Sequence, residues 1–246
     1  MRTKLEPLLC ELHSHTTWSD GALSVRRLVD LYGSRGFDVL CITDHTQRSV
    51  GDPGVPAGEP PGGIRSDNHA AYLTAVLGEA ERALRLYGLL LLPGLELTYG
   101  DMDPLVSAHA LALGIERFVG VDGGIDAAMR EARAAGAAIV AAHPYPVDPG
   151  SVTGRGTQRF ADRWRELEGV VDRYELFNRT ELFAWVAEAG LPSVATGDFH
   201  RLEHLAGWKT LVPCAKDVEA VVRYLRSPRP VYLARLTPEA DARLAA

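Results

Sequence analysis

The sequence has few cysteines, no long apolar run and no excess of positive charge. The three cysteines are odd in number and widely spaced, so neither a disulfide framework nor a cysteine zinc site is expected. The apolar runs, residues 89–92 among them, are too short to cross a membrane, and residues 1–11 contain no apolar signal core. With 26 basic and 32 acidic residues the net charge is −6, so a long nucleic acid is not an expected partner. We therefore expect a cytoplasmic protein with buried free thiols.

Short segments dense in apolar residues are the main structural signal. Each is predicted to be a buried strand: residues 8–12, 39–43, 89–92, 137–142, 170–176, 193–196 and 231–236. Helical spacing of apolar residues lies between them, around residues 25–32, 72–87, 182–187 and 218–225. This alternation predicts an α/β fold with a parallel sheet covered by helices, in a single domain over residues 1–246. Seven or so strands, and no G-x-G-x-x-G after the first, favour a closed (β/α) barrel over an open dinucleotide-binding sheet.

Two segments are too rich in glycine and proline for either regular element. Residues 51–63 contain five glycines and four prolines and are expected to form a loop, with a lid over a site as one role for it. Residues 144–156 form a second such loop directly after a predicted strand.

Most of the histidines are placed at or just beyond the ends of apolar segments. Six of the eight share this position: His13, His15, His45, His109, His143 and His200. Four acids share it as well, with the Pro93-Gly94 pair expected to end the strand before the third of them: Asp20, Asp44, Glu96 and Asp198. In α/β barrels the carboxyl ends of the strands meet and form the active site. The placement predicts a metal site there.

Spacing within the motifs supports metal binding. His13 and His15 are two residues apart on an extended segment, so both imidazoles project from the same face and one ion can bind both. Asp198 and His200 repeat this spacing. A single His-x-His pair arises easily by chance, and a lone histidine at a strand end is commonly a hydrogen-bonded core residue. The joint placement is what indicates a metal cluster.

Several neighbours receive other interpretations. His69 and His204 do not fit the pattern and are interpreted as surface or structural residues. Asp44 is expected either to orient the His45 imidazole or to cap a turn. Glu175 and Asn178 lie at the end of a predicted strand, where they line the pocket or orient ligands, and they are not included among the predicted ligands.

An ordered set of motifs resembles the polymerase and histidinol phosphatase (PHP) family, especially its small stand-alone phosphoesterases. The matching segments span residues 13–200: His13-Ser14-His15-Thr16-Thr17-Trp18-Ser19-Asp20-Gly21, Ile42-Thr43-Asp44-His45, Pro93-Gly94-Leu95-Glu96, Ala108-His109-Ala110, Ala142-His143-Pro144 and Gly197-Asp198-Phe199-His200. The resemblance implies a distorted seven-stranded (β/α) barrel with two to three divalent ions, manganese, zinc or iron.

The resemblance also implies how the ligands are divided among these ions. The first ion would be held by His13, His15, Glu96 and Asp198. Glu96 would bridge to a second ion held by His109 and His143, and a third would be held by Asp20, His45 and His200. Relatives that cleave nucleotides often carry a helical insertion between the positions of His109 and His143, and only residues 110–142 lie between them here, which argues against a nucleotide substrate.

The chemistry of such a centre suits a small anionic phosphate ester. Water bridging two divalent ions becomes hydroxide near neutral pH and can attack phosphorus. Asp198 and His200 are expected to take part in catalysis as well as in metal binding. The phosphoryl oxygens need counter-charge, for which Arg201 is the first choice among the loop cations Arg48, Arg65, Arg179, Arg201 and Lys209. The predicted function is phosphomonoester hydrolysis, with histidinol phosphate, nucleotide and sugar phosphate types left open.

Two other hydrolases use related metal sites. A phosphodiesterase or 3′-5′ exonuclease acting on short nucleic acid would need the same ions and water, although the sequence offers no basic groove. Amidohydrolases also begin with His-x-His after a first barrel strand, but they often bridge their metals with a modified lysine. No lysine lies between Lys4 and Lys209.

Overall fold

The computed structural model describes residues 6–46, 48–49, 62–147 and 157–237. The strands are β1 (Leu8–Glu11), β2 (Val39–Ile42), β3 (His45–Thr46), β4 (Leu90–Tyr99), β5 (Ala108–Leu113), β6 (Ala138–Ala141), β7 (Arg173–Asn178), β8 (Glu181–Leu182), β9 (Ser193–Thr196), β10 (Gly207–Val212) and β11 (Tyr232–Leu236). The helices are α1 (Val25–Gly33), α2 (His69–Tyr87), α3 (Ile125–Ala134), α4 (Arg159–Arg163), α5 (Ala184–Glu188), α6 (Val218–Leu225) and a 3-10 turn, η1 (Leu202–His204). The predicted mixture of strands and helices is confirmed.

One sheet contains all of these strands, and its pairing is mixed. Its order is β11-β10-β1-β2-β4-β5-β6-β7-β8, with β3 beside β4 and β9 beside β7. Strands β1, β2 and β4 are parallel, but β5 is antiparallel to both β4 and β6, and β10 is antiparallel to β1. The prediction of a wholly parallel sheet is therefore wrong. Residues 100–107 connect β4 to β5 without the crossover helix that a parallel neighbour needs.

Strand β4 is longer than predicted, and this places Glu96 inside a strand rather than after one. The Pro93-Gly94 pair does not end it: Pro93 lies opposite Ile42 of β2, and Gly94 lies opposite Leu113, the last residue of β5. On one side the partner of β4 changes here from β2 to β3, and on the other side β5 ends. Proline is tolerated at such an interruption of the ladder because no hydrogen bond from its nitrogen is required.

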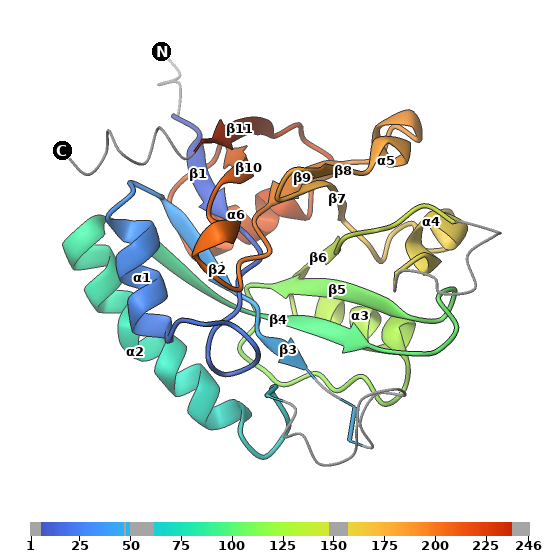
Figure 1. Cartoon of the computed structure of the whole chain (residues 1–246), viewed down its shortest axis with the longest axis horizontal. Helices are drawn as coiled ribbons and strands as arrows, with labels where there is room; N and C mark the ends of the chain where they lie inside the picture. Colours follow the sequence, from blue (N-terminus) through green and yellow to red (C-terminus); the bar gives the residue numbers. More distant parts are fainter. Residues whose placement is uncertain (1–5, 47, 50–61, 148–156, 238–246) are drawn as a thin grey trace.

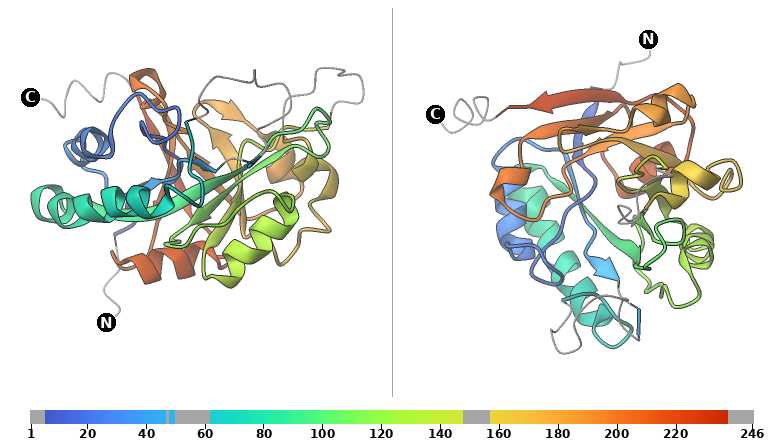
Figure 2. Two further views of the ribbon diagram at one scale, coloured as in Figure 1. Left: turned by 90° about the horizontal axis from the view of Figure 1, so that it is seen from below. Right: turned by 45° about the vertical axis from the view of Figure 1, so that its right-hand side comes forward.

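The sheet curls around its long axis, so that β9 and β10 approach each other (Figure 2). The side chain of Thr210 joins them: its hydroxyl accepts the N–H of Ala195 at 2.9 Å and donates to the Ala195 carbonyl at 2.8 Å. Within the described part of the chain no backbone ladder pairs β9 with β10. The architecture is a curled half-barrel, and a closed seven-stranded barrel stays a prediction.

The predicted helices around residues 25–32, 72–87 and 218–225 are confirmed as α1, α2 and α6. α1 and α2 lie side by side against β2 and β4 (Figure 1). The Asp217 carboxylate caps α6 by accepting the N–H of Ala220 at 2.8 Å. The helix predicted over 182–187 is shorter, because Leu182 pairs with Phe177 in the β7–β8 hairpin. Helices α3 and α4 were not predicted.

The core has two apolar layers because strand side chains alternate in direction. Leu8, Cys10 and Leu12 pack in one layer with Val221 and Leu225 of α6, whereas α1, α2 and α3 pack in the other. All three cysteines are buried free thiols, as predicted. Among the described residues no helix has the length and apolar character needed to cross a membrane. Of the two predicted loops, residues 51–61 and 148–156 lie outside the described part, so the lid expectation is not addressed.

Candidate metal centre

The structure brings the nine predicted metal ligands together, each with a polar atom within 3.7 Å of another member. They are His13 and His15 after β1, Asp20 in the next loop, His45 in β3, Glu96 in β4, His109 in β5, His143 after β6, and Asp198 and His200 after β9. His109 and Glu96 do not follow strands as predicted. His109 is the second residue of β5, and it reaches the cluster because that strand runs antiparallel and places His109 opposite Thr98 of β4.

Four of these side chains, from His13, His15, Glu96 and Asp198, each place one nitrogen or oxygen atom near the same point. The Nε2 atoms of His13 and His15 each lie 3.2 Å from Glu96 Oε2 and 3.5 Å from Asp198 Oδ1. The two imidazoles and Glu96 are fully buried. His13 Nε2, His15 Nε2 and Glu96 Oε2 make no hydrogen bond. Four atoms bound tetrahedrally to one ion at about 2.1 Å lie about 3.4 Å from one another. The observed separations of 3.2–3.5 Å match this spacing, so these residues fit a metal ion.

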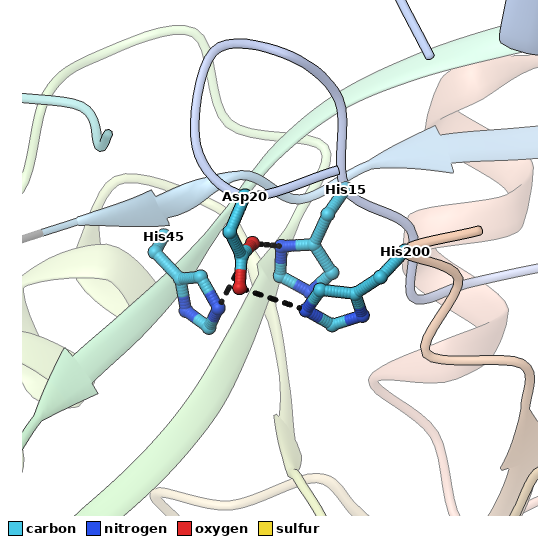
Figure 3. A group of neighbouring side chains, drawn as sticks. All are labelled: His15, Asp20, His45 and His200. Atoms are coloured by element: carbon cyan, nitrogen blue, oxygen red, sulfur yellow. Dashed lines mark ion pairs between the residues drawn. The ribbon is translucent and has the colours of Figure 1, made fainter. Parts of the chain in front are cut away.

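A second group surrounds Asp20 (Figure 3). The carboxylate points between three imidazoles, at 3.7 Å from His15 Nδ1, 3.5 Å from His45 Nε2 and 3.2 Å from His200 Nε2. These four residues form one of the sets whose donor atoms all lie close enough to share an ion. The group contains the predicted third-ion ligands, and His15 connects it to the first set.

The remaining oxygen of Glu96 faces two further imidazoles. Glu96 Oε1 lies 3.1 Å from His109 Nδ1 and 3.2 Å from His143 Nε2. The two oxygens of one buried carboxylate thus face different groups of histidines, which is the geometry expected of a bridging ligand.

The histidines are oriented by residues outside the predicted ligand set. Glu175 Oε1 lies 2.9 Å from His13 Nδ1, and Glu175 Oε2 accepts the N–H of His143 at 2.7 Å. The Thr98 hydroxyl lies 2.7 Å from His45 Nδ1. Fixing the outer nitrogen of a histidine directs its other nitrogen toward the metal. Glu175 was considered from its place at the end of a predicted strand, whereas nothing in the local sequence around Thr98 indicates its role.

Asp44 caps a turn, as one of the two predictions had it, but among the described residues its carboxylate makes no bond to the His45 ring, so the orienting role is wrong. Its carboxylate accepts the N–H of Thr16 at 2.8 Å, the Thr16 hydroxyl at 2.8 Å and the Ser19 hydroxyl at 2.6 Å. These bonds hold the loop between His15 and Asp20 because β2, which leads to Asp44, lies beside β1. Asp44 therefore shapes the loop that carries two of the predicted ligands, His15 and Asp20.

The charges of the cluster shift one another's pKa values. Burial lowers the pKa of the His13 imidazole, but Glu96, Asp198 and Glu175 raise it by more than burial lowers it. The pKa of His13 is therefore well above its usual range. Burial lowers the pKa of His45 as well, and Glu96 and Asp20 raise it to about 10. Burial raises the pKa of Glu96, but His45 and His13 hold it well below its usual range. These shifts favour the protonated form of the His13 and His45 imidazoles when no metal is bound.

A cavity of about 480 Å³ opens beside the cluster. Three predicted ligands line it together with polar residues of the β6 and β7 ends: His109, His143, Asp198, Tyr145, Thr157, Asn178, Arg179, Thr180 and Glu181. Four described non-glycine residues have positive φ, and all of them line this cavity: His143, Thr157, Arg179 and Asp198. Strained backbone of this kind concentrates at functional sites.

The structure separates the cations that were considered for phosphate binding. Arg179 lines the cavity, and its Nη2 lies 2.9 Å from Asp198 Oδ2. Arg201 does not line it: its side chain is 68% exposed and lies 3.8 Å from Glu203. Lys209 is fully buried against Glu11. Arg65 pairs with Asp67, and Arg48 lies over the Tyr99 ring, so neither contacts the cluster.

The two histidines outside the pattern have structural positions. His69 begins α2 and packs near Tyr72 and Phe118. His204 lies in η1, where its Nδ1 accepts the N–H of His200 at 3.2 Å. His204 thus supports the segment that carries a predicted ligand.

Comparison with known proteins gives a fold and one short sequence match. No protein-family model matches the sequence. A stretch of 37 residues, 15% of this chain, is 46% identical to DNA polymerase/3'-5' exonuclease PolX of Bacillus subtilis (strain 168). That match covers 6% of the polymerase, so the chain corresponds to a small part of this relative.

Two solved structures cover nearly the whole chain. A two-domain protein of Bacteroides vulgatus, containing a predicted PHP-like metal-dependent phosphoesterase, has a TM-score of 0.64 at 19% identity over 99% of this chain and 73% of its own. An amidohydrolase of Chromobacterium violaceum, with bound sulfate and no metal, has a TM-score of 0.54 at 16% identity over 94% of this chain and 99% of its own. The resemblance to PHP-like phosphoesterases is confirmed at the level of the fold.

Glu175→Gln should weaken metal binding while the protein stays folded. The amide places an N–H₂ group against either the His13 ring or the His143 N–H, so one of the two loses its acceptor. We expect a roughly 10- to 100-fold loss of Mn²⁺ affinity by calorimetry. Glu131→Gln, which removes a surface carboxylate paired with Arg117, is the control. Equal Mn²⁺ affinity in the two variants would exclude an orienting role for Glu175.

Metal binding should release protons. Because the carboxylates raise the pKa of His13 and His45, the latter to about 10, protons compete with the metal throughout the neutral range. The apparent Mn²⁺ affinity should therefore rise between pH 6 and pH 8, by about tenfold per pH unit for each proton displaced. Calorimetry in two buffers of different ionisation enthalpy counts these protons. An affinity that is independent of pH, with no proton release, would contradict the assignment.

Proposed function

We propose that the protein is a metal-dependent phosphoesterase, and specifically a phosphomonoesterase that hydrolyses a small phosphorylated metabolite. The observation that carries this proposal is the convergence of His13 Nε2, His15 Nε2, Glu96 Oε2 and Asp198 Oδ1 at 3.2–3.5 Å. Three of these atoms are buried without a hydrogen bond. Burying polar atoms in this way costs free energy unless an ion satisfies them.

The donor set suits borderline divalent ions. Mixed imidazole and carboxylate donors favour manganese, zinc or ferrous iron over magnesium, and the described cluster contains no thiolate. We assign one ion to His13, His15, Glu96 and Asp198, a second to Glu96, His109 and His143, and a third to Asp20, His45 and His200. When bound, such ions supply an activated water and positive charge for a phosphoryl group.

The residues beside the ligands suit an anionic, compact substrate. Arg179 holds the Asp198 carboxylate and main-chain carbonyl through Nη2, and its Nη1 takes no part in these bonds. We propose that Nη1 donates to a phosphoryl oxygen while the bond to Asp198 keeps the guanidinium in place. A volume of about 480 Å³ accommodates a small metabolite.

The related hydrolase chemistries are less well supported. The neighbour from Chromobacterium violaceum is an amidohydrolase with bound sulfate, a tetrahedral anion like phosphate. A modified lysine cannot bridge ions in this chain's centre, because the described cluster contains no lysine and Glu96 faces both groups of histidines. This favours phosphoester over amide hydrolysis.

A hydrolysis screen tests the proposal directly. The metal-free protein is loaded separately with Mn²⁺, Zn²⁺ or Fe²⁺, bound metal is counted by elemental analysis, and phosphate monoesters, diesters, amides and lactones are assayed. We expect two to three ions per chain and hydrolysis of monoesters, reduced at least about 10³-fold by Asp198→Ala. Asp67→Ala, at an exposed surface position, is the matched control.

Other outcomes of the screen point elsewhere. Diester hydrolysis alone would favour a phosphodiesterase or exonuclease, and amide or lactone hydrolysis alone would favour an amidohydrolase. A wild-type protein that binds none of the metals would overturn the proposal.

Two arginine variants separate the candidates for phosphate binding. Arg179→Ala should lower kcat/KM by about 10²-fold, because it removes a donor beside the cluster. Arg201→Ala should stay within about twofold of the wild type, because its exposed side chain pairs with Glu203. Steady-state kinetics on the best monoester measures both. A large loss in Arg201→Ala with none in Arg179→Ala would restore the assignment made from the sequence.

A further inference from the structure

A buried ion pair lies behind the proposed metal ligands and takes no part in the chemistry described so far. Lys209 Nζ of β10 is 2.8 Å from Glu11 Oε2 of β1, and both side chains are fully buried. The antiparallel register of β1 and β10, which pairs Cys10 with Thr210, brings the two residues next to each other. Burying an ion pair costs desolvation that the pair itself seldom recovers, so its contribution to stability alone is weak grounds for its presence.

Glu11 connects two segments that carry ligands. Its Oε1 accepts the N–H of Gly197 at 2.8 Å and lies 3.2 Å from the N–H of His13. Its Oε2 accepts the Tyr32 hydroxyl at 3.1 Å, in addition to facing Lys209. The Glu11 carboxylate therefore binds the backbone of His13, just after β1, and the backbone of Gly197, directly before Asp198. Glu11 and Gly197 are 186 positions apart in the sequence.

Gly197 leaves the space that this pair occupies. A Cβ atom there would lie 2.2 Å from Glu11 Oε2 and 2.3 Å from Lys209 Nζ. Because Gly197 does not have positive φ, its backbone conformation is open to other residues. The close approach of the charged pair is what requires glycine.

The contact adds to other bonds that hold Asp198 and its neighbour. The Phe199 N–H donates to the His13 carbonyl at 3.1 Å, the Phe199 carbonyl accepts the His15 N–H at 2.8 Å, and Arg179 pairs with Asp198. Asp198 follows β9, which pairs with β7 on one side and reaches β10 through the Thr210 side chain. Asp198 itself has a φ of 41°, a conformation that the surrounding contacts must hold in place.

We propose that Glu11, Gly197 and Lys209, here called the clamp, are positioning residues. Together with the backbone bonds of Phe199, they set the distance between the predicted ligands that follow β1 and those that follow β9. Lys209 pairs with the Glu11 carboxylate and holds it in place, Glu11 binds the backbone at His13 and Gly197, and Asp198 Oδ1 is thereby held 3.5 Å from the two imidazoles. This inference rests on the proposed metal centre. It predicts that the clamp controls metal affinity as well as folding.

Mn²⁺ titration of the full chain, at a temperature where every variant is folded, tests the clamp. Glu11→Ala with Lys209→Met removes it without leaving an unpaired charge, and we expect at least about tenfold weaker Mn²⁺ binding. Glu11→Gln with Lys209→Met keeps an oxygen acceptor for the two N–H groups and should give an intermediate affinity. Thr210→Val is the matched control, because it breaks the bonds between β9 and β10 away from the ligands: it should lower Tm but leave Mn²⁺ affinity within about threefold.

If Glu11→Ala with Lys209→Met does not fold, two other variants test the proposal: Glu11→Gln with Lys209→Met, and Gly197→Ala. Gly197→Ala displaces the Glu11–Lys209 pair but keeps both charged residues. The proposal is overturned if the folded clamp variants bind Mn²⁺ within about threefold of the wild type, or if Thr210→Val weakens binding as much as they do. A wild type that binds Mn²⁺ but hydrolyses no phosphate ester would refute the proposed function and leave the clamp intact. A wild type that binds no Mn²⁺ would refute both.

Discussion

Five imidazoles surround the buried carboxylate of Glu96, and the arrangement of the site depends on this one group. Its two oxygens lie 2.9–3.2 Å from nitrogens of His13, His15, His45, His109 and His143. A carboxylate without exposure requires positive or metal-bound partners. β4 can supply it because this strand passes through the middle of the sheet, with β2 and β3 on one side and β5 on the other. Histidines from strands on both sides of β4 therefore reach the two oxygens of Glu96.

Around this carboxylate, the geometry is held by contacts between neighbouring strands rather than by the ligands themselves. Glu175 of β7 orients His13, and Thr98 of β4 contacts His45. Asp44 holds the loop that carries His15 and Asp20. Loss of such an outer contact typically weakens metal binding by about 10- to 100-fold. The contacts that fix the cluster are therefore contacts of the sheet, and the four described non-glycine residues with positive φ all line the cavity.

Part of this was predictable because local patterns reflect local physics. Buried strands show as apolar runs and amphipathic helices as 3.6-residue spacing, so β1, β2, α1 and α6 were found close to their bounds. Strand β5 was not predicted, nor was its antiparallel course, because strand direction depends on which strands the chain pairs with. The end of β4 was wrongly predicted for the same reason. Pro93-Gly94 indicated that the strand stops there, but it continues, because these two residues lie where its neighbouring strands change.

The sequence by itself determined the α/β character, the buried thiols and the residue types of the cluster, because imidazoles and carboxylates placed beside apolar runs can be recognised without knowing their partners. Only the tertiary structure decided which atoms face one another. It placed Arg179 rather than Arg201 at the cavity, and it buried Lys209 against Glu11 instead of exposing it to a substrate. These outcomes depend on strand register and on contacts between residues far apart in the chain, and neither leaves a periodic trace in the sequence.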